Sequence, residues 1–166
     1  MVESGGANSG DAHPFFAVGD AAPELVDWWQ TSFTPTVFAA GRAPRRVKEL
    51  LRLRLALAHG VEYPGLGDAA AAGITPAEVA ELGGPADELH LSDGERAVIA
   101  LADELALRNM EGYLGEELYE RLAAHYDDGA IFELGMTMAV LCGFAKFLQV
   151  YGLTGVEAGG ADAVSP

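Results

Sequence analysis

The sequence predicts an all-α fold, in which a single domain contains seven or eight helices. Apolar residues recur at helical spacing along almost the whole chain, and no segment alternates apolar and polar residues as a half-buried strand does. Residue types that begin and end helices separate these segments. The length of 166 residues suits one domain, which at this size buries about 70% of its unfolded surface.

The first expected helices are short and precede the basic part of the chain. They cover residues 22–29 and residues 35–40. A stronger helix is expected over residues 44–58, because it begins with a proline, which suits a first turn, and then builds one apolar face. The next is expected over residues 62–73, since Pro64 can lie only in a first turn and a glycine ends the segment.

The second half of the chain carries two capping boxes, in which Ser or Thr is followed three residues later by Glu. Thr75 begins a helix that ends before a Gly-Gly-Pro breaker, and Ser92 begins one that runs to about Asn109. Helices over residues 115–126 and 128–151 complete the predicted set.

The chain is strongly acidic, with a net charge of −15 at pH 7 and a pI of about 4.4. Such a field repels phosphate backbones and anionic lipids, so we expect no nucleic-acid partner and no membrane binding. The longest apolar stretch, residues 131–153, contains Glu133 and Lys146. The interval between them is too short for a membrane span of ~20 residues, so a buried core helix is expected.

Six of the ten basic residues fall within thirteen positions, namely Arg42, Arg45, Arg46, Lys48, Arg52 and Arg54.

The single cysteine, Cys142, excludes an internal disulfide, and a reducing, cytoplasmic compartment is expected. Its place in an apolar run indicates a buried structural thiol.

Small and polar residues predict a disordered arm over residues 1–13 and a flexible tail over residues 155–166, on either side of a helical domain at residues 14–154. The arm lacks the basic and apolar regions of a signal peptide.

The basic segment also carries the first candidate site residues. Glu49 lies on a helix that is otherwise rich in Leu and Arg. A carboxylate among leucines suits a general acid or base, because desolvation favours its protonated form. Arg52 or Arg54 would then hold a carboxylate substrate by a two-pronged contact. The alternative is that Glu49 pairs with Arg45, Arg46 or Arg52 on a solvated helix face.

Other motifs with chemical meaning are scarce. No cluster of His, Cys, Asp and Glu has metal-ligand spacing, and no phosphate-cradling or dinucleotide loop is present, so neither a metal nor a cofactor is expected. His59 is the best placed of the four histidines, because it lies at a helix end that leads into an unusual turn rich in glycine and proline.

At these residues the sequence resembles the carboxymuconolactone decarboxylase and alkyl hydroperoxidase D-like superfamily. Residues 48–54, Lys-Glu-Leu-Leu-Arg-Leu-Arg, are similar to its Arg-Glu-Leu-x-x-Leu-Arg helix, and residues 72–75, Ala-Gly-Ile-Thr, resemble its Ala-Gly-Leu-Thr junction. Residues 95–105 and 122–134 resemble later segments of the superfamily in the same order. The resemblance spans about residues 34–153 and implies the helical fold of that superfamily.

The peroxidase branch of the superfamily carries Cys-x-x-Cys-x-x-x-His, with its catalytic glutamate twelve residues before the first cysteine. Counting from Glu49 places these positions at Val61, Pro64 and Asp68. A thiol peroxidase needs a nucleophilic thiolate and a resolving partner, and the chain has neither at these positions. Peroxidase activity is therefore not expected.

A second branch reads Glu-Tyr-Glu-Trp-x-x-His at the same place. Glu62 and Tyr63 match its first two residues, whereas Asp68 stands where that branch has histidine. The acid/base residue of the family is thus either replaced by a carboxylate or lost.

The resemblance implies a decarboxylase-like lyase or isomerase, independent of cofactors, that acts on a small oxygenated carboxylic acid or lactone. Glu49 and Asp68 would move protons, while Tyr63 would hydrogen-bond the substrate. Decarboxylation next to a carbonyl needs only an electron sink and a protonating acid, so these groups would suffice. The candidate substrate-binding residues are Arg52, Arg54, His59, Glu62, Trp28 and Trp29.

The alternative is a non-catalytic binding or assembly protein that kept the fold and lost the motif. An open cavity beside Glu49, Tyr63 and Asp68 would favour the enzyme, and a filled one would favour this alternative. The pair Trp28-Trp29 has a plain structural interpretation too, as one core anchor and one interface residue. Family members assemble as trimers or hexamers, so the chain is expected to associate with itself in either case.

Overall fold

The computed structural model describes residues 13–156. The predicted arm over residues 1–13 and tail over residues 155–166 lie almost entirely outside these residues. Within the described part every regular element is a helix, as predicted. The elements are α1 (Pro14–Gly19), α2 (Pro23–Asp27), the π-helix η1 (Trp28–Ala39), α3 (Arg45–His59), α4 (Pro76–Glu81), the 3-10 helix η2 (Ala86–Glu88), α5 (Asp93–Leu105), α6 (Glu116–Ala123) and α7 (Asp128–Tyr151).

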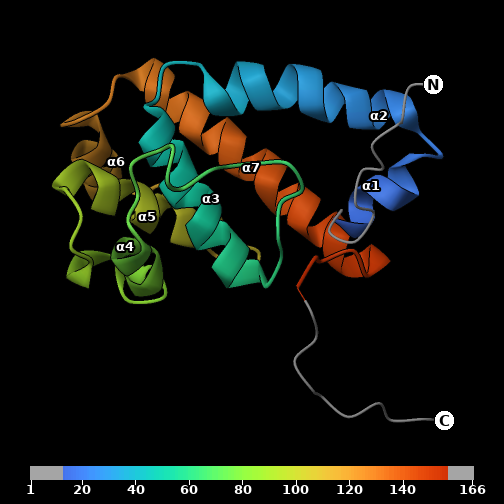
Figure 1. Cartoon of the computed structure of the whole chain (residues 1–166). Coiled ribbons are helices and arrows are strands. Elements are labelled where there is room, and N and C mark those ends of the chain that lie inside the picture. The colour runs from blue at the N-terminus through green and yellow to red at the C-terminus, as the bar shows by residue number, and fades with distance from the viewer. Residues whose placement is uncertain (1–12, 157–166) are drawn as a thin grey trace, which may run out of the picture.

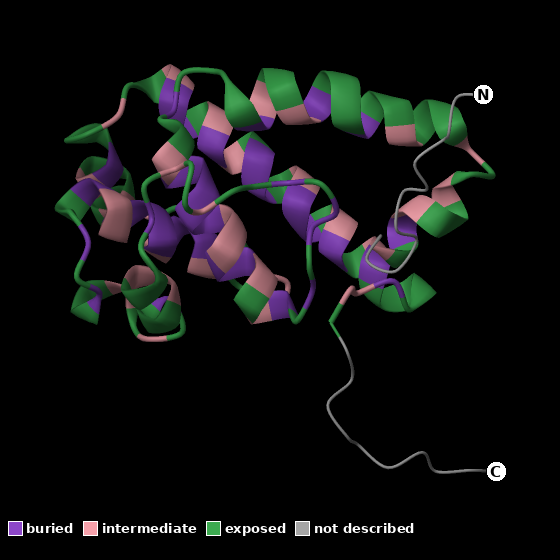
Figure 2. Cartoon of the chain, viewed as in Figure 1, coloured by how far each residue is buried: buried purple, intermediate pink, exposed green. Residues whose placement is uncertain are grey.

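α3 lies at the centre of the fold and packs against both α5 and α7 (Figure 1). It begins after Pro44 and ends at Gly60, whose left-handed backbone (φ 63°) closes the last turn. Leu51 and Leu55 are fully buried on its inner face. Figure 2 shows that buried residues concentrate on α3, α5 and α7, so the core lies among these helices.

The segment before α3 differs from the prediction, because the two short helices expected over residues 22–29 and 35–40 are parts of one longer helical segment. α2 continues directly into η1, which contacts α7 (Figure 1). Pro35 does not end this segment, since the wider π-helical turn shifts the bonding to residues five apart. The backbone N–H of Ala40, for example, donates to the carbonyl of Pro35.

The helix predicted over residues 62–73 is wrong, because the structure forms a series of turns there. Gly65, Gly67 and Gly73 have φ values of 65°, 86° and 72°. These left-handed conformations cannot continue a right-handed α-helix. Pro64 therefore lies in a turn rather than in a first helical turn.

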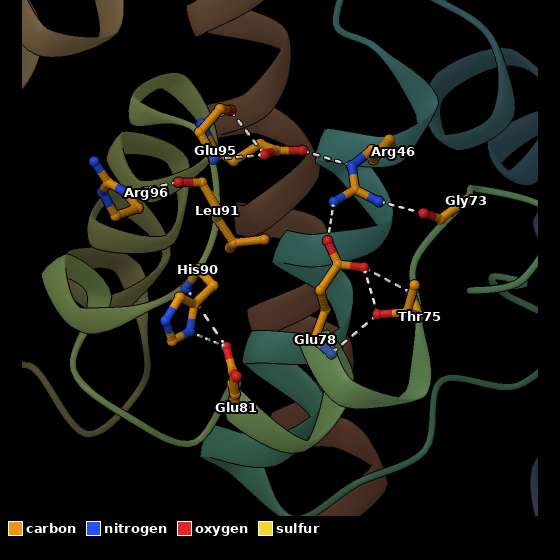
Figure 3. Close-up of polar contacts among 10 residues, drawn as sticks. Arg46, Gly73, Thr75, Glu78, Glu81, His90, Leu91, Glu95 and Arg96 are labelled. Atoms are coloured by element: carbon orange, nitrogen blue, oxygen red, sulfur yellow. Dashed lines mark hydrogen bonds and ion pairs between the residues drawn. The ribbon is translucent and has the colours of Figure 1, made fainter.

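Both predicted capping boxes form, and Arg46 of α3 links them (Figure 3). The Thr75 hydroxyl accepts from the backbone N–H of Glu78, and Ser92 and Glu95 repeat the arrangement at the start of α5. Arg46 donates to Glu78 at 2.5 Å and to Glu95 at 2.6 Å. Hydrogen bonds from the backbone of Thr75 and from Arg46 lower the pKa of Glu78 to about 2. This network holds α4 and α5 against α3.

The buried side chain of Lys48 on α3 binds the C-terminal end of η1. Its side chain is fully buried, and its ammonium donates to the carbonyls of Val37 and Ala40 and pairs with Glu133 of α7. The Glu133 carboxylate also accepts the backbone N–H of Arg42 at 2.6 Å. The ion pair thereby joins three elements at one point.

α7 is a core helix, as predicted, and it packs against α3, α5 and η1. Its length and apolar composition alone would suit a membrane span, a property that it shares with buried core helices. Its nine buried residues are Ala130, Ile131, Leu134, Thr137, Met138, Leu141, Cys142, Ala145 and Leu148.

Candidate functional site

The candidate site is built around an ion pair between Glu49 and Arg52 on α3. One carboxylate oxygen of Glu49 accepts from Arg52 Nη2 at 2.7 Å, and the other accepts from Nε at 2.9 Å. A spacing of three residues places both side chains on the same helix face. The side chain of Glu49 is only 1% exposed and that of Arg52 is 13% exposed. The pairing was one of the two expectations for Glu49, but the pair is buried rather than solvated.

The backbone of Gly67 covers this ion pair. A Cβ at this position would lie 2.2 Å from Arg52 Nε and 2.4 Å from Glu49 Oε2. The φ of 86° also favours glycine, because residues with a Cβ rarely adopt a left-handed backbone conformation. The turn that contains Gly67 therefore approaches the carboxylate more closely than any residue with a side chain allows.

Arg52 keeps donor capacity beyond its bond to Glu49. The carboxylate occupies Nε and Nη2, and Nη1 makes no hydrogen bond to another described residue. Among the described residues, no side-chain nitrogen or oxygen is both buried and without a partner, so Nη1 is at least partly accessible to solvent. Glu49 thus holds the guanidinium by one edge, and Nη1 on the other edge can still donate a hydrogen bond to a ligand.

Tyr63 and His59 form a second buried polar pair next to the first. Tyr63 is 3% exposed, and its hydroxyl lies 3.5 Å from His59 Nδ1. Burial raises the pKa of Tyr63, and burial together with the charge of Arg108 lowers the pKa of His59. Both groups are therefore neutral at pH 7. Because His59 Nε2 accepts the backbone N–H of Leu107, the imidazole proton lies on Nδ1 and faces the tyrosine oxygen.

A pocket of about 530 Å³ opens beside these two pairs. Arg52, Glu62 and Tyr63 supply its polar side chains, while Glu49 lies behind Arg52 and His59 lies behind Tyr63. Its volume is typical of small-molecule sites. The rest of the wall is apolar or glycine and consists of Leu53, Ala56, Leu57, Gly60, Val61, Leu66, Val79 and Val156.

Two of the charged residues singled out in the sequence lie outside this pocket. Asp68 is exposed, and its carboxylate accepts the backbone N–H of Ala71 at 2.9 Å within a turn. Arg54 is buried, and Asp103 binds its guanidinium through two hydrogen bonds of 2.7 Å. The structure therefore does not bring Asp68 and Glu49 together in one pocket, and it commits Arg54 to joining α3 and α5.

Trp29 is the core anchor that the structural interpretation of the tryptophan pair anticipated. Trp29 is buried, and its indole N–H donates to the carbonyl of Pro64 at 2.7 Å. Its ring stacks on Phe144 of α7. Trp28 is half exposed, and neither tryptophan lines the pocket. Trp29 thus supports the site indirectly, by holding the turn that contains Tyr63.

Sequence reasoning missed the residues that act on the site through their backbone. Gly67 covers the ion pair, and Leu107 fixes the imidazole of His59 from 48 positions away. The closely spaced glycines after Pro64 were a visible signal of an unusual turn, but no local rule links that turn to Glu49. The contact of Leu107 leaves no signal in the sequence.

The described residues contain no group of three or more His, Cys, Asp or Glu side chains that could hold a metal ion. Cys142 lies on the buried side of α7, where its thiol donates to the carbonyl of Leu105. Burial raises the pKa of this thiol to about 11. It therefore remains a thiol, not a thiolate, at neutral pH.

Comparison with known proteins places these residues in a family context. The chain matches the model of the carboxymuconolactone decarboxylase family over residues 23–104, a range that includes Glu49, Arg52 and Tyr63. No curated protein matches the chain.

A solved structure with the same fold is that of a protein of unknown function from Agrobacterium tumefaciens, provisionally described as an antioxidant defence protein AhpD. It superimposes with a TM-score of 0.66 at 16% sequence identity, over 82% of this chain and 92% of that one. The fold is therefore shared even where the sequences have diverged. The family match and the shared fold together support a place for the chain in the carboxymuconolactone decarboxylase and alkyl hydroperoxidase D-like superfamily.

Proposed function

We propose that the protein is a cofactor-independent lyase or isomerase that acts on a small oxygenated carboxylic acid or lactone in the pocket beside Arg52. The observation that carries this proposal is the guanidinium of Arg52, which lines the pocket and which Glu49 holds by two nitrogens, while Nη1 has no partner among the described residues and is not fully buried. Such a fixed, partly desolvated guanidinium is suited to an anionic group or to a developing negative charge.

The pocket residues fit a decarboxylation. In a β-keto acid the bond between the α-carbon and the carboxylate breaks, its electron pair passes to the carbonyl as an enolate, and carbon dioxide leaves. Arg52 and the neutral phenol of Tyr63 donate hydrogen bonds to the oxygen that becomes negative. Glu62 at the rim then passes a proton from water to the carbon.

The same residues fit an isomerisation. Glu62 would remove a proton next to the carbonyl and return it at another carbon, while Arg52 and Tyr63 stabilise the enolate between the two steps. This assignment gives Glu62 the proton transfer that the sequence suggested for Asp68. It makes Glu49 a positioning residue that orients Arg52.

Cys142 supports the exclusion of thiol peroxidase chemistry. Its thiol is buried, its pKa is raised to about 11, and no second cysteine exists to resolve a sulfenic acid. A peroxidatic cysteine needs the opposite environment, in which the thiolate is favoured and accessible.

The test is a screen of small keto acids and lactones, followed by proton NMR, with variants of the residues that line the pocket. We expect Glu62→Gln and Tyr63→Phe each to lower kcat by about tenfold or more. Asp68→Asn is the matched control, because it neutralises a nearby carboxylate outside the pocket, and it should retain activity. A substrate that both pocket variants turn over at the full rate would refute the proposal.

A second candidate is a binding protein without catalysis, and one observation favours it. Arg52 engages both oxygens of Glu49, and the Asp68 carboxylate caps a turn, so among residues 13–156 Glu62 is the one carboxylate on the pocket wall. This candidate predicts that small carboxylates bind with an affinity that depends on Arg52 and that none of them is converted.

A further inference from the structure

A second pocket, of about 470 Å³, lies on a different face of the molecule. Residues from α5, from the connection between α5 and α6, from α6 and from the first half of α7 line it, and we name it the α5–α7 pocket. It shares no lining residue with the pocket beside Arg52. Leu101 and Ile131 form part of its apolar wall.

Three aromatic side chains surround the α5–α7 pocket and remain accessible. Tyr113 is 76% exposed, Phe132 is 71% exposed and Tyr119 is 39% exposed. Large aromatic side chains gathered at a pocket with such exposure are typical of binding surfaces. Their ring faces carry partial negative charge and attract cations.

Two carboxylates line the same pocket and are held in place. Asp128 accepts a hydrogen bond from the Tyr119 hydroxyl at 2.7 Å, and Glu104 accepts from the backbone N–H of Tyr113 and from Asn109. Each carboxylate uses one oxygen for these bonds, and its other oxygen has no hydrogen-bond partner among residues 13–156. No lysine or arginine of the described chain lines the pocket.

We propose that the α5–α7 pocket binds a small organic ammonium compound with an apolar or aromatic body. The apolar wall would take the body of the ligand, while the aromatic rings and the two carboxylates would surround its charged nitrogen. Charge complementarity selects this occupant. A carboxylate ligand would meet Glu104 and Asp128, and a second copy of this chain would bring a net charge of −15 to an acidic rim.

Gly135 of α7 offers a way to fill the pocket without disturbing the fold. It lines the pocket, and a Cβ built there meets no atom within 4 Å. Gly143 is a matched control on the same helix, because a Cβ there also meets no atom within 4 Å and the residue lies outside the pocket. Leucine at either position replaces a helical glycine, so both variants should fold at least as well as the original chain.

The experiment is calorimetric titration of the full chain with 4-phenylbutylamine and with 4-phenylbutanoate, which share one carbon skeleton and differ in charge. We expect the amine to bind once per chain, at least tenfold more tightly than the carboxylate. Gly135→Leu should weaken amine binding by tenfold or more, Gly143→Leu should leave it unchanged, and Asp128→Asn should weaken it severalfold. An Arg52→Gln variant identifies any carboxylate binding that belongs to the other pocket.

Three outcomes would overturn the proposal. The first is equal affinity for the two compounds in the Arg52→Gln variant, and the second is amine binding that Gly135→Leu does not reduce. The third is a fall in molecular mass by light scattering when Gly135 but not Gly143 is replaced, which would assign the face to contact between copies of the chain. None of these outcomes depends on catalysis, so they leave the proposed function untouched.

Discussion

Replacing Gly67 by alanine should disturb the Glu49–Arg52 ion pair without altering either charged residue. The new methyl group would lie 2.2 Å from Arg52 Nε and 2.4 Å from Glu49 Oε2, so the turn or the ion pair has to move. A non-glycine residue in the left-handed conformation costs about 1–2 kcal/mol by itself. Complete separation of a buried pair costs about 3–5 kcal/mol, because it leaves an uncompensated charge.

Gly73 provides the control for the backbone part of this cost. Its φ of 72° is close to the 86° of Gly67, but a Cβ at Gly73 meets no atom within 4 Å. Gly73→Ala should therefore lose only the strain. If the pair is partly separated, Gly67→Ala should lose about 2–3 kcal/mol more, which corresponds to a further drop in Tm of about 4–12 °C for a chain of this size.

Urea unfolding followed by circular dichroism measures both losses, and titration with a small carboxylate reports whether Arg52 has moved. We expect Gly67→Ala to weaken carboxylate binding and Gly73→Ala to leave it intact. Equal losses of stability in the two variants, with equal binding, would show that the backbone at Gly67 does not hold the ion pair, and the reasoning would be refuted.

Three further predictions concern ionisable side chains that are buried or paired. Lys48→Met should destabilise the fold by about 3–5 kcal/mol in urea titrations, because Glu133 loses its partner, and adding Glu133→Gln should recover part of this loss. Glu78 has a pKa of about 2 in the fold against a usual 4.5, so its ionised form stabilises the fold above pH 4.5 and this contribution disappears as the pH falls towards 2. Glu78→Gln should thus lower stability at pH 7, with a smaller difference from the original chain at pH 3.5. Cys142 should react with iodoacetamide at least about 100-fold more slowly in the native chain than in urea at pH 7.5, because its thiol is buried and its pKa is about 11; comparable rates would contradict its placement.

The parts of the fold that were predictable depend on residues close in sequence. The boxes at Thr75 and Ser92 involve neighbours three positions apart, and both form as expected. Within residues 62–73 two local rules competed, since a proline suits a first turn whereas several glycines permit left-handed turns. The glycines prevailed because α3 and the turn must pack closely at Gly67, a requirement that appears only in three dimensions.

The candidate site was predictable to a similar extent. The i,i+3 spacing of Glu49 and Arg52 allowed their pairing to be anticipated. Their burial could not be anticipated, because it depends on a turn that follows much later in the chain. The walls of the pocket include Val79 and Val156, which lie 77 positions apart in the sequence, and neither carries a local signature of a binding site.

The ion pairs that join α3 to the rest of the fold also determine what approaching solutes experience. Eight of the ten lysine and arginine side chains are paired with carboxylates. Few free positive charges therefore remain to offset the net charge of −15 that an approaching solute encounters. An anionic substrate must diffuse towards Arg52 against this field, and an organic ammonium ion is drawn in by it. Because the Debye length shrinks from about 30 Å to about 8 Å between 0.01 M and 0.15 M salt, added salt should speed the encounter with a carboxylate and slow the encounter with an amine.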